Sequence, residues 1–271
     1  MEYVKLGNTG MEVSKLCLGC MGFGEPERGR EKWSIGETES REVIKKALES
    51  GINFFDTANL YSSGSSEEIV GKALKDFANR DEIVLASKLY FPMFDGPNAK
   101  GLSRKSIFAE IDHSLKRLHT DYLDLYIIHR WDYDTPIEET MEALHDLVKT
   151  GKVRYIGASS MHAWQFAKAQ FIAEKNGWTK FVSMQNLYNL LYREEEREMI
   201  PLLQDQKVAM TPWSPLAGGR LTRDIGAVTA RASQAAQINL PAYIVASDNE
   251  VISRVHRLAD ERGITRGQVA T

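Results

Sequence analysis

The chain has 271 residues, of which 43% are hydrophobic and 26% are charged, and its formal net charge is −3. These values are typical of a globular protein, in which a barrel of this length commonly forms one domain, and they exclude a disordered or fibrous class. The 37 acidic and 34 basic residues form no long run of one sign, so nothing indicates binding to nucleic acid or to an anionic membrane, and a small-molecule partner is favoured.

The N-terminus has no basic start followed by an apolar stretch, and nowhere do about eighteen apolar residues run together, so we predict a soluble cytosolic protein. "EYVKL" and "EVSKLCL" flank "GNTG", which suits a tight turn and predicts an N-terminal β-hairpin.

The two cysteines of the chain, Cys17 and Cys20, follow this hairpin. A redox-active cysteine pair lies at a helix N-terminus, which lowers the thiol pKa, and a zinc site needs two further ligands. We therefore favour packing or loop-wall roles for the two cysteines, with reduced thiols. No metal site is predicted.

Short apolar runs then alternate with longer amphipathic ones. The runs are continuous, as expected for strands buried on both faces of a parallel sheet, and they lie at residues 16–18, 53–55, 83–87, 123–128, 153–158, 181–184 and 208–211. Helices are predicted at residues 37–50, 103–118, 135–149, 163–174 and 194–204. Gly51 fits the end of the first helix, and Ser103 and Thr135 fit the N-caps of the next two.

This alternation indicates a parallel sheet with right-handed crossovers. Because no G-x-G-x-x-G follows the first strand, an α/β fold of the (β/α)8 TIM-barrel type is favoured over a doubly wound sheet. The predicted strands number seven, one fewer than the eight of such a barrel. Residues 248–262 predict a helix, and Thr265 caps another in which the sequence stops. We therefore expect a single barrel domain over residues 1–271 that lacks the eighth strand and the C-terminal loop.

Polar side chains stand where several predicted strands end. These are Asp56, with Tyr61 in the loop that follows, Lys88 and His129. Each alone has a structural explanation, such as a turn cap or a core histidine, but the C-terminal strand ends of a barrel meet at one mouth. There Lys88 would lower the pKa of the Tyr61 phenol, Asp56 would hold Lys88 charged, and His129 would orient a carbonyl oxygen. The set predicts a proton-transfer site.

Five stretches together resemble the aldo-keto reductases over nearly the whole chain: "FFDTANLYSSGSSEEIVGKAL", "LASKL", "DLYIIHRWD", "RYIGASS" and "PWSPLAGGRL". "SPLAGGRL" and "FGE" look most like the bacterial YajO-like branch, near the potassium-channel β-subunits. The resemblance implies NADPH-dependent reduction of aldehydes and ketones, with Tyr61 as general acid, Lys88 and Asp56 tuning it, and His129 binding the carbonyl. The alternative is a cofactor-binding regulatory or scaffold subunit with little turnover. The complete tetrad favours the enzyme.

The resemblance also implies a cofactor site. Trp213 would stack on the nicotinamide and Ser159 and Gln185 would hold its amide, whereas Ser160 stands where many members have asparagine. The backbone of residues 214–218 and Arg220 would wrap the pyrophosphate, for which "SPLAGG" offers free amides. The expected cofactor residues are Met21, Asp56, Ser159, Gln185, Trp213, Ser214, Pro215, Leu216, Gly218 and Arg220. The segment that grips the 2′-phosphate in the family is missing, so NADH is not excluded.

An apolar wall around the substrate completes the expected site. Its candidates are Phe23, Tyr90 and Trp131, with Met21 and Phe91 beside them, and each fits the core equally well. The expected partner is a small carbonyl compound, without nucleic acid or membrane. The resemblance further implies a monomer or a weak homo-oligomer.

Overall fold

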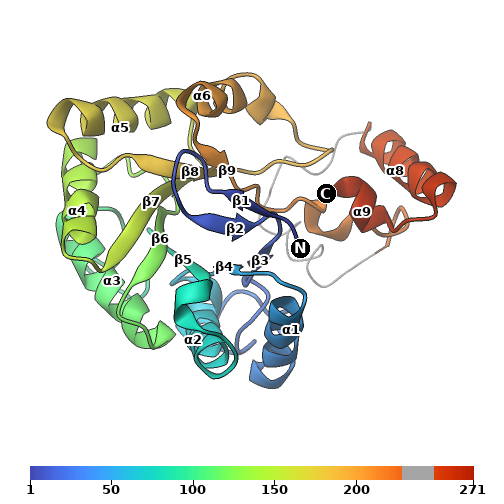
Figure 1. Cartoon of the computed structure of the whole chain (residues 1–271), viewed down its shortest axis with the longest axis horizontal. Helices are drawn as coiled ribbons and strands as arrows, with labels where there is room; N and C mark the ends of the chain where they lie inside the picture. The colour runs from blue at the N-terminus through green and yellow to red at the C-terminus, as the bar shows by residue number, and fades with distance from the viewer. Residues whose placement is uncertain (228–246) are drawn as a thin grey trace. The chain divides into compact units, whose positions relative to one another are not determined.

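A seven-stranded sheet organises the fold (Figure 1). Each strand pairs with the next one in the chain, in the order β3-β4-β5-β6-β7-β8-β9, and the pairs from β3 to β7 are parallel. The strands are β3 (Cys17–Gly19), β4 (Phe54–Asp56), β5 (Val84–Leu89), β6 (Leu123–Ile128), β7 (Val153–Ser159), β8 (Phe181–Gln185) and β9 (Ala209–Met210). The sheet curls with helices outside it, which confirms the predicted barrel-like α/β fold.

The structure is a computed structural model that describes residues 1–227 and 247–271. Its helices are α1 (Glu37–Glu49), α2 (Ser65–Phe77), α3 (Arg104–Leu118), α4 (Ile137–Lys149), α5 (Ala163–Asn176), α6 (Met199–Gln206), α8 (Asp248–Arg262) and α9 (Arg266–Ala270). The chain divides into two compact units. The first contains residues 1–184 and 202–209, and the second contains residues 185–201 and 210–271. Each unit is described by itself.

Several predicted helix boundaries are confirmed. Gly51 has φ +83°, a conformation that favours glycine at the end of α1. The Ser103 hydroxyl accepts a hydrogen bond from the Ser106 amide at 3.2 Å and caps α3. Thr265 caps α9 in the same way, accepting from the Gln268 amide at 3.2 Å. Local side-chain chemistry therefore sets these helix ends, which is why the sequence shows them.

Other predicted elements differ from the structure. The prediction of Thr135 as an N-cap was wrong, because its hydroxyl donates to Asp132 Oδ2 at 2.7 Å and α4 begins after Pro136. Residues 194–204 form a 3₁₀ turn, Glu194–Glu196, followed by α6. Helix α2 was not predicted, although it buries an apolar stripe of Ile69, Val70, Ala73 and Leu74.

The N-terminal hairpin lies across one end of the curled sheet (Figure 1). Strands β1 (Tyr3–Lys5) and β2 (Glu12–Ser14) pair antiparallel, as predicted. Buried side chains of the hairpin and of three sheet strands form one cluster: Leu6, Val13, Phe54, Val84, Ala86, Leu125 and Ile127. Apolar burial of this kind is the main stabilising contribution in a barrel interior.

Gly7 brings the hairpin turn against β8 and the start of β9. Its φ is +56°, and a Cβ there would lie 2.7 Å from the Ala209 amide nitrogen and 2.9 Å from the Val182 carbonyl oxygen. We expect Gly7→Ala to lower the free energy of unfolding by about 2–4 kcal/mol, because it adds left-handed strain to a backbone clash. Gly10→Ala is the matched control, since a Cβ at Gly10 meets no atom within 4 Å. Equal urea midpoints for the two variants would contradict this expectation.

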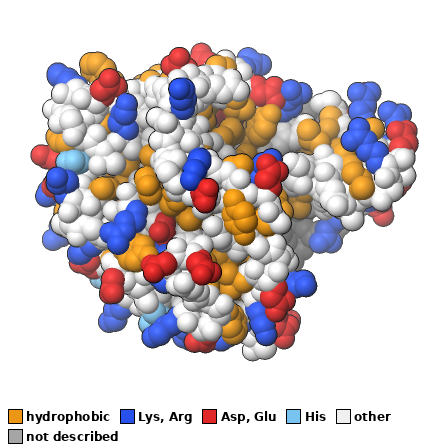
Figure 2. Space-filling view, in the orientation of Figure 1, with side chains coloured by type: hydrophobic (Ala, Val, Ile, Leu, Met, Phe, Trp, Pro, Cys, Tyr) orange, Lys and Arg blue, Asp and Glu red, His pale blue; other side chains and the backbone are white. Residues whose placement is uncertain are grey.

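The visible surface mixes charges of both signs. On the face that Figure 2 shows, Lys and Arg side chains are interspersed with Asp and Glu, without a broad area of one sign. In the described part of the chain, no helix combines the length and the apolar character needed to cross a bilayer.

Candidate active site

Three neighbouring strands carry polar side chains at or next to their carboxyl ends. Asp56, Lys88 and His129 each follow by two positions a residue of the buried cluster, respectively Phe54, Ala86 and Ile127. Residues two apart in a strand point to the same face. The carboxylate, the ammonium group and the imidazole therefore lie inside the sheet, directly beyond the apolar core and at the carboxyl ends of the strands.

The Lys88 ammonium group is the centre of this cluster. Its side chain is fully buried, and Nζ donates to Asp56 Oδ2 at 2.6 Å, to the Thr57 carbonyl oxygen at 2.8 Å and to the Tyr61 hydroxyl at 3.1 Å. An ammonium group has three protons to donate. All three are used, so the position of Nζ is fixed relative to the phenol.

The Tyr61 hydroxyl and His129 lie side by side. The two rings meet edge to face, with centroids 5.9 Å apart and an interplanar angle of 83°. Because the phenol oxygen accepts from Lys88, its own proton is available to another acceptor. His129 Nδ1 is buried and has no hydrogen-bond partner in the described residues. The structure thus brings together all four residues of the predicted proton-transfer site.

Burial decides how these groups ionise. It raises the pKa of Tyr61 above its ordinary value, and the charge of Lys88 only partly opposes the rise. The predicted lowering of the Tyr61 pKa is therefore not found. Burial also acts against the charged form of Lys88, yet the neighbouring Asp56 carboxylate raises the pKa of that amine above its usual value. For His129, burial and then the charges of Lys88 and Arg130 hold the pKa well below the usual range. At neutral pH the site holds a neutral phenol, a charged amine and a neutral imidazole.

A segment before α1 contacts the turn that carries Tyr61. In this turn Ser62 and Ser63 both have left-handed backbone conformations, with φ of 45° and 50°. The buried Glu31 carboxylate accepts from the Ser62 amide at 3.0 Å, and Arg28 Nη2 donates to the Ser63 carbonyl oxygen at 3.2 Å. A Cβ on Gly24 would lie 2.3 Å from Ser62 Cβ, so the contact is close. These interactions hold a strained turn in place.

The outer face of β5 anchors α2 behind the same turn. Ser87 points away from Lys88, and its hydroxyl donates to Glu67 Oε1 at 2.5 Å. Glu67 is completely buried, and its other oxygen accepts from Arg117 Nε at 2.6 Å. A Cβ on Gly64 would lie 2.9 Å from Arg117 Cδ. This arrangement ties α2, α3 and β5 together beneath Tyr61.

Aromatic side chains lie next to His129 and in the loop after β6. The Phe91 ring lies 5.1 Å from His129 and 5.2 Å from Tyr90. Trp131, half-buried in the loop after β6, lies 6.0 Å from Trp164. The sequence analysis did not name Trp164, although an aromatic residue in the first turn of the helix after β7 could have indicated it. In the structure the Trp164 side chain is 58% exposed.

Two further candidates lie in the turn after β3. Phe23 is buried, and its backbone forms a parallel bridge with Ile35. Met21 is half-buried beside it. Burial and backbone pairing favour a packing role for Phe23.

The expected cofactor residues are divided between the two units. In the first unit, buried Ser159 ends β7 and its hydroxyl lies 3.2 Å from that of Ser160. Ser160 has φ +51°, a left-handed turn at the strand end. Met21 and Asp56 also belong to the first unit. The second unit contains Gln185, Trp213, Ser214, Pro215, Leu216, Gly218 and Arg220.

Within the second unit, Trp213 opens a loop of unusual backbone conformation. Its amide donates to the Asn186 carbonyl oxygen at 3.0 Å, and Asn189 Nδ2 donates to the Ser214 carbonyl oxygen at 3.0 Å. Ser214, Ala217 and Gly218 have φ of 56°, 51° and 64°. Arg220, expected at the pyrophosphate, pairs with Asp248 at 2.7 Å.

The Aldo/keto reductase family model matches residues 15–271. The chain belongs to the aldo/keto reductase family. It is therefore an oxidoreductase, in a family that generally uses NAD(P)H and acts on small carbonyl substrates.

Relatives agree with this assignment. The chain is 47% identical over 291 residues to versiconal hemiacetal acetate reductase of Aspergillus parasiticus, covering 100% of this chain and 84% of that protein. It is 45% identical over 295 residues to aldo-keto reductase AMT2 of Alternaria alternata, covering 99% and 79%. With aldo-keto reductase dtxS3 of Metarhizium robertsii the identity is 41% over 290 residues, covering 97% and 77%. All three organisms are fungi, so the comparisons do not support the expected bacterial branch. The expected C-terminal truncation is not supported either.

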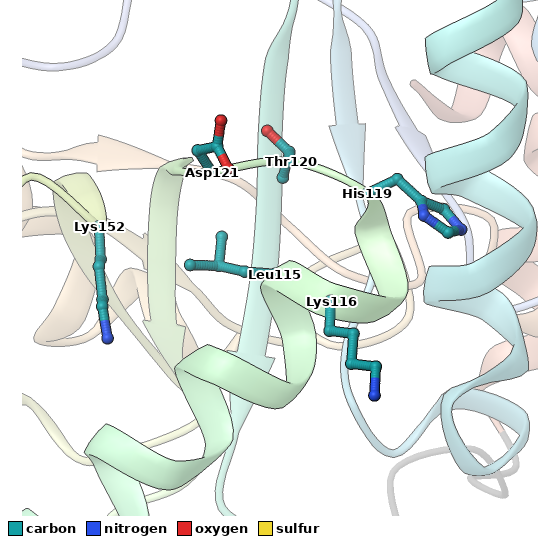
Figure 3. Close-up of a pocket in the computed structure, with 6 residues that line it drawn as sticks. All are labelled: Leu115, Lys116, His119, Thr120, Asp121 and Lys152. Carbon is teal, nitrogen blue, oxygen red and sulfur yellow. The ribbon is translucent and has the colours of Figure 1, made fainter.

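A surface hollow of about 460 Å³ lies elsewhere in the first unit (Figure 3). It is lined by Leu115, Lys116, His119, Thr120, Asp121 and Lys152. These residues end α3 and precede β6 and β7, so the hollow is at the end of the sheet opposite to Lys88. Function in such barrels lies at the carboxyl strand ends. The described residues also contain no group of three or more His, Cys, Asp or Glu side chains suited to a metal ion.

Proposed function

We propose that the protein is an NADPH-dependent aldo-keto reductase that reduces aldehydes and ketones to alcohols, with Tyr61 as general acid. The observation that carries this proposal is the hydrogen bonding of Lys88 Nζ to both Asp56 and Tyr61. This bonding leaves the phenol proton free for the substrate oxygen while a fixed positive charge stands beside it.

Each of the four residues has a distinct task in the reaction. NADPH supplies the hydride to the carbonyl carbon when it is bound. Tyr61 donates its proton to the oxygen on which negative charge develops, and Lys88 stabilises the phenolate that remains. Asp56 keeps Lys88 charged. His129 is neutral, so it donates a hydrogen bond to the same oxygen without competing as an acid.

The loop after β9 suits an anionic cofactor group. Among the described residues, the amides of Leu216 and Gly218 donate to no backbone carbonyl oxygen. Backbone amides in a left-handed turn form concave anion sites. We assign the pyrophosphate to Ser214, Pro215, Leu216, Gly218 and Arg220, and the nicotinamide to Met21, Asp56, Ser159, Gln185 and Trp213. Tyr90 and Trp131 would flank the substrate.

Consumption of NADPH tests the proposal. The enzyme is mixed with NADPH, or with NADH, and a panel of aldehydes, and the absorbance of the reduced cofactor is followed. Turnover with NADPH that exceeds turnover with NADH supports the proposed cofactor. Cofactor binding without turnover of any carbonyl compound would instead favour a regulatory subunit.

The pH dependence of reduction follows from the shifted pKa values. Tyr61 must be protonated to act, and its raised pKa moves the loss of the acid to alkaline pH. The lowered pKa of His129 keeps the imidazole neutral on the acid side. We expect kcat to be level between about pH 6 and pH 9 and to fall above about pH 10. Stopped-flow rates of the chemical step across this range provide the measurement, and an activity loss centred below about pH 8 would contradict the assignment of Tyr61.

A further inference from the structure

Arg130 places a second positive charge at the mouth of the site. It follows His129 directly and is half-buried. Its Nη1 donates to the His129 carbonyl oxygen at 2.6 Å, and its guanidinium carbon lies 5.5 Å from the centroid of the Phe91 ring. Because the Phe91 ring in turn contacts His129, the guanidinium group lies beside the position proposed for the substrate.

This guanidinium group has no carboxylate partner in the described part of the chain. Other arginines that are half-buried near the first-unit helices are paired, as Arg117 is with Glu67 and Arg80 with Asp124. For Arg130, burial lowers the pKa below its ordinary value, and the acidic groups that oppose this are the phenols of Tyr61 and Tyr90, not carboxylates. A half-buried charge without a counter-ion is unfavourable. An anion supplied from outside would therefore stabilise this guanidinium group.

We infer that Arg130 binds a carboxylate of the substrate, so that the preferred substrates are carbonyl compounds with an anionic group beyond a short apolar or aromatic spacer. This inference rests on the proposed function. Among the described residues, Arg130 donates one hydrogen bond, from Nη1 to the His129 carbonyl oxygen. The other N–H groups can therefore bind a carboxylate, which a guanidinium group holds with two parallel hydrogen bonds. Phe91 and Tyr90 provide aromatic surface beside the charge.

A second role for Arg130 must be separated from this one. Its charge also acts on Tyr61, where it opposes the rise in the phenol pKa. Loss of that effect would slow the reduction of every substrate alike. The ratio of kcat/KM between an anionic aldehyde and a neutral aldehyde of the same shape cancels the shared effect and isolates carboxylate binding.

The test compares 4-carboxybenzaldehyde with methyl 4-formylbenzoate. We expect the wild type to prefer the carboxylate, and Arg130→Met to reduce that preference about 10- to 100-fold. Arg130→Lys keeps the charge without the planar fork, so it should retain part of the preference. The matched control is Arg154→Met, which removes an exposed guanidinium group that stacks on Tyr122 at 4.1 Å, and it should leave the ratio unchanged.

Two kinetic results would overturn the inference: no preference for the carboxylate in the wild type, or a preference that Arg130→Met changes less than about twofold, as when the rates for both aldehydes fall equally. Binding of benzoate, measured by calorimetry on the wild type and on Arg130→Met, gives a readout without catalysis. If neither aldehyde is reduced but benzoate binding depends on Arg130, the proposed function fails and the anion site stands. If benzoate binds both proteins equally, the anion site fails.

Discussion

Replacing Tyr61 with phenylalanine is expected to lower kcat for aldehyde reduction about 10²- to 10⁴-fold, the range typical of a lost general acid. The ring is kept, so its edge-to-face contact with His129 is retained and the change is confined to the hydroxyl that Lys88 binds. The measurement is single-turnover oxidation of NADPH, with binding of NADPH titrated separately by fluorescence. Unchanged cofactor affinity beside the fall in kcat would locate the loss in the proton transfer.

Tyr126 offers a matched control for this variant. It is also completely buried, and its hydroxyl has no hydrogen-bond partner in the described residues. Tyr126→Phe removes a buried polar group that is unsatisfied, so it should leave kcat unchanged and keep or raise the melting temperature. If Tyr61→Phe and Tyr126→Phe reduced activity equally, or if Tyr61→Phe remained as active as the wild type, Tyr61 would not be the acid.

Replacing Arg117 with methionine is expected to lower the free energy of unfolding by about 3–5 kcal/mol. The side chain of Glu67 has no exposed surface, and the loss of Arg117 Nε leaves its carboxylate buried with only Ser87 as a hydrogen-bond donor among the described residues. Methionine preserves much of the apolar packing against Gly64, so the effect isolates the charge. Urea unfolding followed by circular dichroism gives the measurement.

Two further variants serve as a control and as a rescue of Arg117→Met. Arg193→Met breaks the exposed pair with Glu196, which is screened by solvent, and should lower the free energy of unfolding far less than Arg117→Met does. Adding Glu67→Gln to Arg117→Met removes the unpaired charge and should recover part of the lost stability. If Arg117→Met were no more destabilising than Arg193→Met, the buried pair would not anchor α2.

The sequence predicted most of the site because its signals are local. A continuous apolar run followed by a polar residue marks a strand that ends at the mouth, and Asp56, Lys88 and His129 all follow this pattern. Helix α2 escaped prediction, since it begins within two residues of a turn of left-handed serines that interrupts any periodic pattern. Thr135 was misplaced because a hydroxyl can serve a loop carboxylate as well as a helix end.

By itself, the sequence determined the family, the order of strands and helices, and which side chains stand at the strand ends, since these depend on residue type and spacing along the chain. The tertiary structure decided how the groups ionise. The charge of Lys88 predicts a lowered pKa for Tyr61, whereas the burial of the phenol raises it, and burial is a property of packing. Only the fold likewise brings Glu31 to the Ser62 amide, because that contact joins segments 31 residues apart in the chain. Packing also decides which acidic groups lie near Arg130, and in the described residues these are phenols and not carboxylates.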